Sequence, residues 1–165
     1  MTELDTEDKI AFVSLITSHS GIIHKICRLY RDRIEDREDL FQEITFQLWK
    51  SYSKFKGNAK ISTWLYRIAL NTAINTFRKK QPNVNYTVNL PDVADELPDE
   101  ELLAKQQQLF AALKLLNDAE KAIITLYLED MSYQQIAEIT GITDNYVGVK
   151  INRIKTKIQS IITRL

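Results

Sequence analysis

The three prolines of this 165-residue chain all lie in one acidic segment, and they limit how far any helix can run. Pro82, Pro91 and Pro98 fall within residues 81–104, which hold six acidic residues and no lysine or arginine. Because proline lacks an amide N–H and disfavours helical geometry in the residue before it, a continuous helix cannot cross this segment. The sequence therefore predicts two domains, residues 1–80 and 99–165, joined by a flexible acidic linker over residues 81–98.

Apolar residues recur at helical spacing in both flanking domains, and the chain has only four glycines. These features favour an all-α protein of two small helical domains over a turn-rich β-sandwich or barrel. In the first domain, the pattern predicts a helix from residue 10 that bends near residues 18–21, and another helix after Asp36. A loop over residues 54–60 and a helix over residues 61–80 follow.

The second domain has the spacing of a helix-turn-helix. Ser132, with Gln135 three residues later, predicts a capping box that opens a short helix, and Gly141 suits a left-handed helix end. The small Ala137 lies four residues before this glycine and Val147 lies six residues after it, so the short helix can cross closely over the next one. The alternative is a pair of helices that only pack together.

The last predicted helix carries side chains suited to DNA, because Asn, Lys and Arg can hydrogen-bond base edges or hold phosphates in a major groove. Gly148 interrupts it at a cost of about 1 kcal/mol relative to alanine. A close approach by DNA, a close approach by a neighbouring helix and chance all remain possible explanations of this glycine. The residues predicted on the outer side are Asn145, Tyr146, Val149, Lys150 and Arg153.

The first domain contains a long stretch without any carboxylate, from Ile44 to Pro91. Cations that follow a phosphate backbone, mixed with rings on which bases stack, suit single-stranded or opened nucleic acid. Nucleic acid is therefore the leading partner, although the whole chain has a formal net charge of zero. The cations are Lys50, Lys54, Lys56, Lys60, Arg67, Arg78, Lys79 and Lys80, and the aromatic residues interleaved with them are Phe46, Trp49, Tyr52, Phe55, Trp64, Tyr66 and Phe77.

Within this stretch, the helix over residues 61–80 places polar side chains on one face by spacings of three and four residues. Trp64 and Tyr66 near its start either stack on an unpaired base or pack in the core. The preceding loop, residues 54–60, offers small residues and backbone donors for an extruded base. The polar face is formed by Arg67, Asn71, Asn75 and Arg78.

The helix after Asp36 carries an acidic and amide-bearing patch formed by Asp39, Gln42 and Glu43. Phe46 and Trp49 follow at three-residue steps. The patch is either a solvated face or, because exposed aromatic residues lie beside it, a surface for docking another protein.

Enzymatic patterns are lacking in the sequence. The only histidines, His19 and His24, have no second ligand pair for zinc, and no phosphate-binding glycine loop or nucleophile motif occurs. We therefore expect no enzymatic activity, metal or cofactor. The single Cys27, a polar N-terminus and the lack of an apolar run of about 20 residues indicate a cytoplasmic protein with no membrane insertion of its own.

Three ordered blocks of the sequence resemble the extracytoplasmic-function (ECF) subfamily of bacterial sigma-70 RNA polymerase sigma factors. Residues 39–49, DLFQEITFQLW, resemble the family's D-L-x-Q-E-x-F-x-x-x-W helix. Residues 55–57, FKG, followed by residues 63–71, TWLYRIALN, resemble the next block with its W-L-Y-R-I-A-x-N core. Residues 128–137, LEDMSYQQIA, resemble the G-x-S-Y-x-E-I-A approach to the helix-turn-helix, although Asp130 and Met131 replace the usual glycine.

This resemblance implies an alternative sigma factor that binds core RNA polymerase at its β′ clamp and β flap and directs initiation at specific promoters. It also implies a probable anti-sigma factor. The implied polymerase-binding residues are Asp39, Leu40, Gln42, Glu43, Phe46 and Trp49. Those for the opened −10 element are Lys54, Phe55, Lys56, Asn58, Ala59, Lys60, Trp64, Arg67, Asn71, Asn75 and Arg78. Those for the duplex −35 element are Tyr133, Thr143, Asn145, Tyr146, Val149, Lys150 and Arg153.

Two other functions compete with this one. A stand-alone helix-turn-helix regulator would bind duplex DNA without polymerase, but it leaves the carboxylate-free stretch unexplained. A nucleic-acid enzyme such as a resolvase-like recombinase needs a nucleophile or a metal site that the sequence does not provide.

Overall fold

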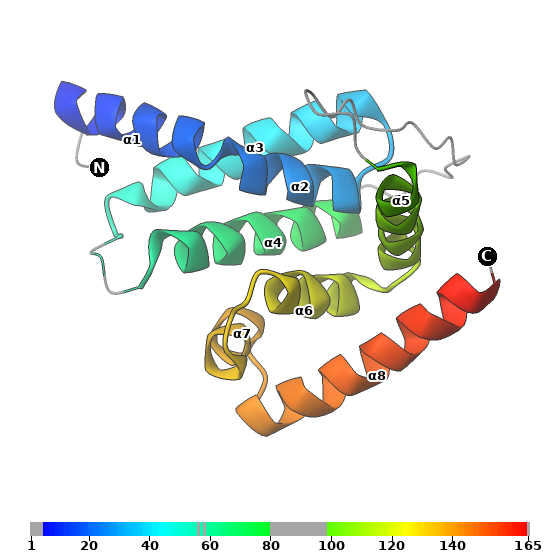
Figure 1. Ribbon diagram of the computed structural model, residues 1–165. Coiled ribbons are helices and arrows are strands. Elements are labelled where there is room, and N and C mark those ends of the chain that lie inside the picture. Colours follow the sequence, from blue (N-terminus) through cyan, green and yellow to red (C-terminus); the bar gives the residue numbers. More distant parts are fainter. Residues whose placement is uncertain (1–4, 56, 58, 80–98, 165) are drawn as a thin grey trace. The chain divides into compact units, whose positions relative to one another are not determined.

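The computed structural model describes residues 5–55, 57, 59–79 and 99–164, and within these residues every regular element is an α-helix (Figure 1). The chain divides into two compact units, Met1–Asn85 and Tyr86–Leu165. The helical structure of the described residues agrees with the predicted all-α class. The linker predicted over residues 81–98 lies outside the described residues.

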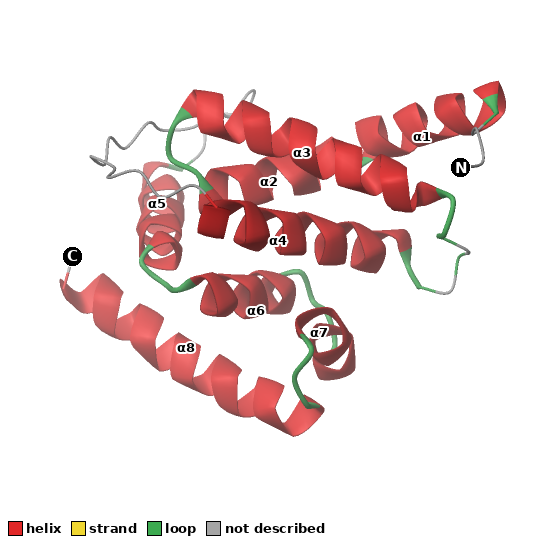
Figure 2. Ribbon diagram, turned by 180° about the vertical axis from the view of Figure 1, so that it is seen from behind, coloured by secondary structure: helices red, strands yellow, loops and turns green. Residues whose placement is uncertain are grey.

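The described residues of unit 1 form four helices: α1 (Thr6–Ser18), α2 (Ser20–Tyr30), α3 (Ile34–Tyr52) and α4 (Ile61–Lys79). Helices α2, α3 and α4 pack against one another, and α1 packs against α2 and α3 (Figures 1 and 2). The axes of α1 and α2 differ by 59° at a one-residue break, which confirms the predicted bend. Within the described part of the chain, no single helix has the length and hydropathy to cross a membrane, although the bent α1–α2 pair meets that test by length and composition.

The core of unit 1 follows from helical periodicity. In α3, Leu40, Ile44 and Leu48 recur every four residues and are all buried, so they form the stripe that packs on α2 and α4. Ile23 and Leu65, from α2 and α4, have no exposed surface. Each such side chain contributes about 1.5–3 kcal/mol by leaving water.

Unit 2 contains α5 (Glu100–Lys114), α6 (Asp118–Leu128), α7 (Tyr133–Thr140) and α8 (Asp144–Arg164). The long α8 packs against the other three helices, and α7 also packs against α6. Figure 1 shows the short α7 beside the first turns of α8. The buried stripe of α8 is formed by Val147, Ile151, Ile154 and Ile158.

Local side-chain caps fix where the helices of unit 2 begin. Asn117 and Glu120 form a reciprocal capping box, in which each side chain accepts the backbone N–H of the other at 3.1 Å or less. Ser132 and Gln135 do the same at the start of α7. Both pairs satisfy amide groups that a helix N-terminus leaves free. The capping box predicted at Ser132 and Gln135 is therefore confirmed.

Candidate nucleic-acid interface

The turn between α7 and α8 has the geometry expected of a helix-turn-helix. Gly141 adopts φ 77°, and its N–H donates to the Ala137 carbonyl oxygen at 2.8 Å. Glycine takes this left-handed conformation without the steric cost of a Cβ atom. Ala137 and Val147 are buried on either side of the turn, and the N–H of Tyr146 donates to Thr143 Oγ1 at 3.3 Å. The turn thus fixes the direction in which α8 leaves α7.

The structure brings the predicted −35 residues together on the surface of this motif, which we call the α8 surface. Lys150 is half-buried, with its Nζ 5.4 Å from the ring centroid of Tyr146, and the other six residues are exposed. Asn152, which the sequence analysis did not select, is exposed two helical turns after Asn145. A spacing of seven residues is the signal that could have found it. The α8 surface comprises Tyr133, Thr143, Asn145, Tyr146, Val149, Lys150 and Arg153.

Gly148 lies against the aromatic ring of Tyr133. An ideal Cβ atom at position 148 would lie 3.2 Å from Tyr133 Cε2 and 3.7 Å from Cδ2. Of the explanations that the sequence left open for this glycine, the structure thus provides the close approach of a neighbouring helix. The sequence did not indicate this contact, because Tyr133 lies on α7 and Gly148 lies on α8, and the turn between the two helices brings them together.

Two lysines near the middle of α8 contact α6 and help to hold the helix in place. Lys157 Nζ donates to Glu120 Oε2 at 2.9 Å. Burial raises the pKa of Glu120, but the hydrogen bonds from Lys157 and the Asn117 N–H outweigh it and hold the pKa below its usual range. Lys155 Nζ donates to the Tyr127 hydroxyl at 2.8 Å and lies 4.3 Å from that ring's centroid.

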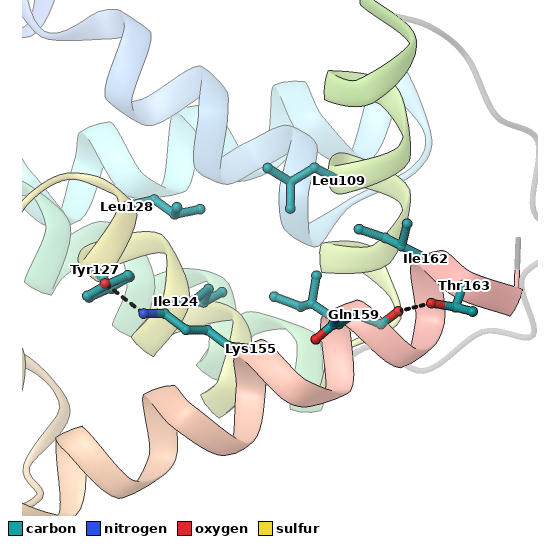
Figure 3. A pocket seen from close by; sticks show the side chains of 9 residues that line it. Leu109, Ile124, Tyr127, Leu128, Lys155, Gln159, Ile162 and Thr163 are labelled. Atoms are coloured by element: carbon teal, nitrogen blue, oxygen red, sulfur yellow. Dashed lines mark hydrogen bonds between the residues drawn. The ribbon is translucent and has the colours of Figure 1, made fainter. Parts of the chain in front are cut away.

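An apolar groove of about 320 Å³ lies between α5, α6 and α8, away from the α8 surface (Figure 3). Aliphatic side chains from all three helices form most of it, and Lys155 supplies the one cation of the lining. Such a lining suits an apolar protein segment rather than DNA. The lining residues are Leu109, Ile124, Tyr127, Leu128, Lys155, Ile158, Gln159, Ile162 and Thr163.

In unit 1, α4 presents part of the predicted −10 face. Asn71 and Asn75 are exposed one turn apart, and Arg67 is half-buried one turn before them, with a buried Nε that has no hydrogen bond among the described residues. The side chain of Arg78 lies outside the described residues. The α4 face defined by Arg67, Asn71 and Asn75 can therefore offer hydrogen bonds along three consecutive turns.

Aromatic rings at the ends of α3 and α4 form one cluster, in which Trp64 is buried and Trp49, Tyr52 and Phe55 are half-buried. Trp64 is only 8% exposed, stacks on Phe55 with 4.8 Å between ring centroids, and lies 6.4 Å from Tyr52. Phe12 of α1 meets Trp49 and Tyr52 edge-on at 4.9 and 5.3 Å. Such aromatic pairs contribute about 0.5–1.5 kcal/mol each beyond their burial. The place of Phe12 in this cluster was not predicted, because nothing in the local pattern of α1 indicates ring partners on another helix.

The burial of Trp64 changes the role that we assign to it. A ring packed in this cluster can stack on a base only by leaving the cluster, so the predicted base contact of Trp64 would require a rearrangement. Lys54 and Lys60 in that loop are exposed, and Phe55 and Ala59 are half-buried. Lys56 and Asn58 lie outside the described residues.

Of the six residues predicted to bind polymerase, three are exposed on the outer face of α3, two are half-buried and one is buried. Asp39 and Gln42 are exposed, Phe46 is 53% exposed, and Glu43 is half-buried and accepts a hydrogen bond from Gln47 Nε2 at 2.9 Å. Leu40, in contrast, is 3% exposed and belongs to the core because it points toward α2 and α4. Trp49 is half-buried beside Phe12. We call Asp39, Gln42, Glu43 and Phe46 the α3 patch.

Groups that could hold a metal or act as a nucleophile do not gather in the described parts of the two units. There, no three His, Cys, Asp or Glu side chains lie close enough to hold a metal ion. Cys27 is buried, and this burial raises the pKa of its thiol to about 12 despite three nearby arginines. A thiol with so high a pKa stays protonated at neutral pH and is a poor nucleophile.

Comparison with known proteins assigns both units. Residues 15–82 match the family model of sigma-70 region 2, and residues 106–158 match that of sigma-70 region 4. The chain is 32% identical to the ECF RNA polymerase sigma-E factor of Haemophilus influenzae, with 96% of this chain and 90% of that protein covered. It is 28% identical to the ECF RNA polymerase sigma factor SigW of Bacillus subtilis, with 88% and 86% covered.

Solved structures share the fold at low sequence identity. Sigma factor RpoE, in complex with the anti-sigma factor NepR from Bartonella quintana, gives a TM-score of 0.74 at 17% identity, with 93% of this chain and 97% of that chain covered. CnrH, in complex with the cytosolic domain of CnrY, gives 0.67 at 18% identity, with 94% and 90% covered.

A helix-turn-helix unit that matches region 4, together with a helical unit that matches region 2, defines the class of sigma-70 transcription initiation factors. Within that class, the chain belongs to the ECF group. It is an alternative sigma factor that directs transcription initiation.

Proposed function

We propose that the two units divide promoter recognition between an opened and a duplex element. The α4 face and the loop before it bind the melted −10 element, and the α8 surface binds the −35 element in the major groove. The observation that carries this proposal is the α8 surface itself, where exposed amide, cationic and aromatic side chains project from a helix fixed by a glycine turn. Such side chains suit base edges and phosphates.

Residues of the loop and of α4 are assigned to the −10 element for a different reason. Lys54 and Lys60 are exposed beside the aromatic cluster, and Asn71 and Asn75 project from the adjoining helix. Cations beside amide side chains can hold the backbone and base edges of an unpaired strand. We assign Trp64 the part of holding this loop in place.

Two further surfaces are assigned to core RNA polymerase. The α3 patch, with an exposed Phe46 among acidic and amide side chains, is assigned to the β′ clamp. The apolar groove of unit 2 is assigned to the β flap, because an aliphatic lining favours a protein segment over DNA. A protein that positions polymerase in this way performs no chemistry of its own, so we propose that the chain is not an enzyme and acts in the cytoplasm.

An anti-sigma factor is the proposed regulatory partner. Support comes from the two solved relatives, of which RpoE was determined with the anti-sigma factor NepR and CnrH with the cytosolic domain of CnrY.

Run-off transcription tests this function. Purified protein is mixed with core RNA polymerase and a library of fragments of the source genome, and the 5′ ends of the transcripts are sequenced. We expect start sites that share two motifs separated by a constant spacing. Specific duplex binding without polymerase, and no transcripts with it, would instead indicate a stand-alone helix-turn-helix regulator.

A further inference from the structure

Position 148 lies within the α8 surface although it has no side chain. Gly148 is half-buried, and the exposed residues Asn145 and Asn152 lie three positions before it and four after it on the same side of α8. Glycine weakens a helix relative to alanine, so its presence in the second turn of α8 calls for a compensating contact. That contact is the ring of Tyr133.

The ring of Tyr133 lies in close contact with the place where a side chain at position 148 would begin. Carbon atoms in good contact are about 3.5–4.0 Å apart, whereas an ideal Cβ at position 148 would lie 3.2 Å from Tyr133 Cε2. Tyr133 is nevertheless 43% exposed, so part of its ring and hydroxyl remains accessible from outside. The ring comes from the first turn of α7, next to the first turns of α8 (Figure 1).

We propose that Tyr133 and Gly148 form one specificity-determining unit: the glycine admits the ring, and the ring supplies the contact surface that α8 lacks at this position. This inference rests on the proposed function of the α8 surface. An aromatic face presents apolar contact area, which suits the thymine methyl group in a major groove, whereas a cationic side chain would select guanine. The unit therefore favours thymine at one or two adjacent positions of the −35 element.

The experiment compares base preferences of four full-length proteins assembled with core RNA polymerase: wild type, Gly148→Ala, Tyr133→Ala and the double variant. Each holoenzyme transcribes templates in which the −35 region is randomised, and the transcribed templates are sequenced. We expect Gly148→Ala to lower the thymine preference by up to about tenfold, because its Cβ pushes the ring of Tyr133 by a few tenths of an ångström. Tyr133→Ala should have the same effect, and the double variant should lose no more than either single variant.

Two conservative controls separate this role from a merely structural one. Tyr133→Phe keeps the ring and should keep the preference, so a loss equal to that of Tyr133→Ala would overturn the assignment to the ring. Gly21→Ala adds a methyl group to α2 in open space and should leave the preference unchanged. Thermal unfolding should show that Gly148→Ala remains folded, since the partly exposed ring of Tyr133 can shift by a few tenths of an ångström.

Additive effects of the two substitutions, or an unchanged preference in Gly148→Ala, would overturn the inference while leaving the proposed function intact. A wild-type holoenzyme that gives no transcripts would overturn both, and the absence of any product distinguishes that failure from the first.

Discussion

Unit 2 presents its candidate DNA-binding side chains on the outside of a helix-turn-helix, whereas unit 1 holds part of its candidate surface in a loop that packs on aromatic rings. In unit 2, six of the seven predicted residues are exposed, and the helix beneath them is fixed by its own apolar stripe. In unit 1, Phe55 of the loop stacks on the buried Trp64 of α4. Substitutions on the α8 surface should therefore act on DNA affinity alone, whereas aromatic substitutions in unit 1 should act through folding.

The largest expected effect is that of Trp64→Ala. Removing a buried Trp typically costs about 3–5 kcal/mol, so unit 1 should lose stability and promoter opening together. Both tryptophans of the chain, Trp49 and Trp64, lie in unit 1. Fluorescence of the remaining Trp49 therefore reports the unfolding of this unit, and permanganate footprinting reports promoter opening. A variant that unfolds like wild type but fails to open DNA would show that the ring contacts a base directly.

The next effect tests the contrasting behaviour of unit 2. Arg153→Ala should weaken binding of holoenzyme to a −35 duplex by about 1–3 kcal/mol if the side chain reads a base, and should leave thermal stability unchanged. Fluorescence anisotropy at several salt concentrations measures this. Arg164→Ala, which removes an exposed arginine from the last turn of the same helix, is the matched control. Equal losses in the two variants would mean that general charge, and not the α8 surface, determines binding.

A smaller effect is expected at the exposed part of unit 1. Asn71→Ala removes an exposed side chain that makes no hydrogen bond to the described residues, so stability should change by less than about 0.5 kcal/mol. The free energy of promoter opening should become less favourable by about 1 kcal/mol, the value of a typical hydrogen bond. The ratio of open to closed promoter should therefore fall roughly fivefold. The assay is permanganate reactivity of the −10 region at saturating holoenzyme. A matching loss of polymerase binding would contradict the assigned role in DNA capture.

The difference between the units also determines what could be predicted from the sequence. The capping boxes at Asn117 and Ser132 and the glycine turn at Gly141 were predictable, because each depends on residues within three or four positions of one another. The helix-turn-helix and its exposed face follow from such local signals. The all-α class and the bend after Ser18 were predictable in the same way.

Contacts between distant segments could not be predicted. Leu40 and Trp64 share their helices with exposed functional candidates, and their burial depends on partners contributed by other helices. Phe12 of α1 joins the aromatic cluster although it lies 37 positions before Trp49 in the sequence. The presence of Gly148 is explained by the ring of Tyr133, which comes from another helix.

The smallest expected effect concerns the link between α6 and α8. Because its partners lower the pKa of Glu120 below the ordinary value of 4.5, the ionised carboxylate stabilises the fold above that pH, and this contribution disappears as pH falls through the lowered pKa. Glu120→Gln keeps an oxygen for the Asn117 N–H and should cost about 0.5–1 kcal/mol at pH 7. In urea unfolding followed by circular dichroism, the difference from wild type should shrink below pH 4.5.

The exposed pair of Glu101 and Lys105, 2.8 Å apart within α5, provides the control for that measurement. Glu101→Gln should change stability by no more than a few tenths of a kcal/mol at either pH, because exposed pairs within one helix contribute little. A pH dependence as large as that of Glu120→Gln would assign the effect to surface charge in general.

The most direct test of the whole account is capture of core RNA polymerase by the full chain. The wild type is compared with Gln42→Ala/Glu43→Ala, which truncates the α3 patch, and with Thr6→Ala/Glu7→Ala, which removes the same charge from α1. We predict that the wild type and the α1 variant bind core polymerase, and that the α3 variant loses most of its binding while remaining folded. A folded wild type that fails to bind, or equal binding by all three proteins, would contradict the account.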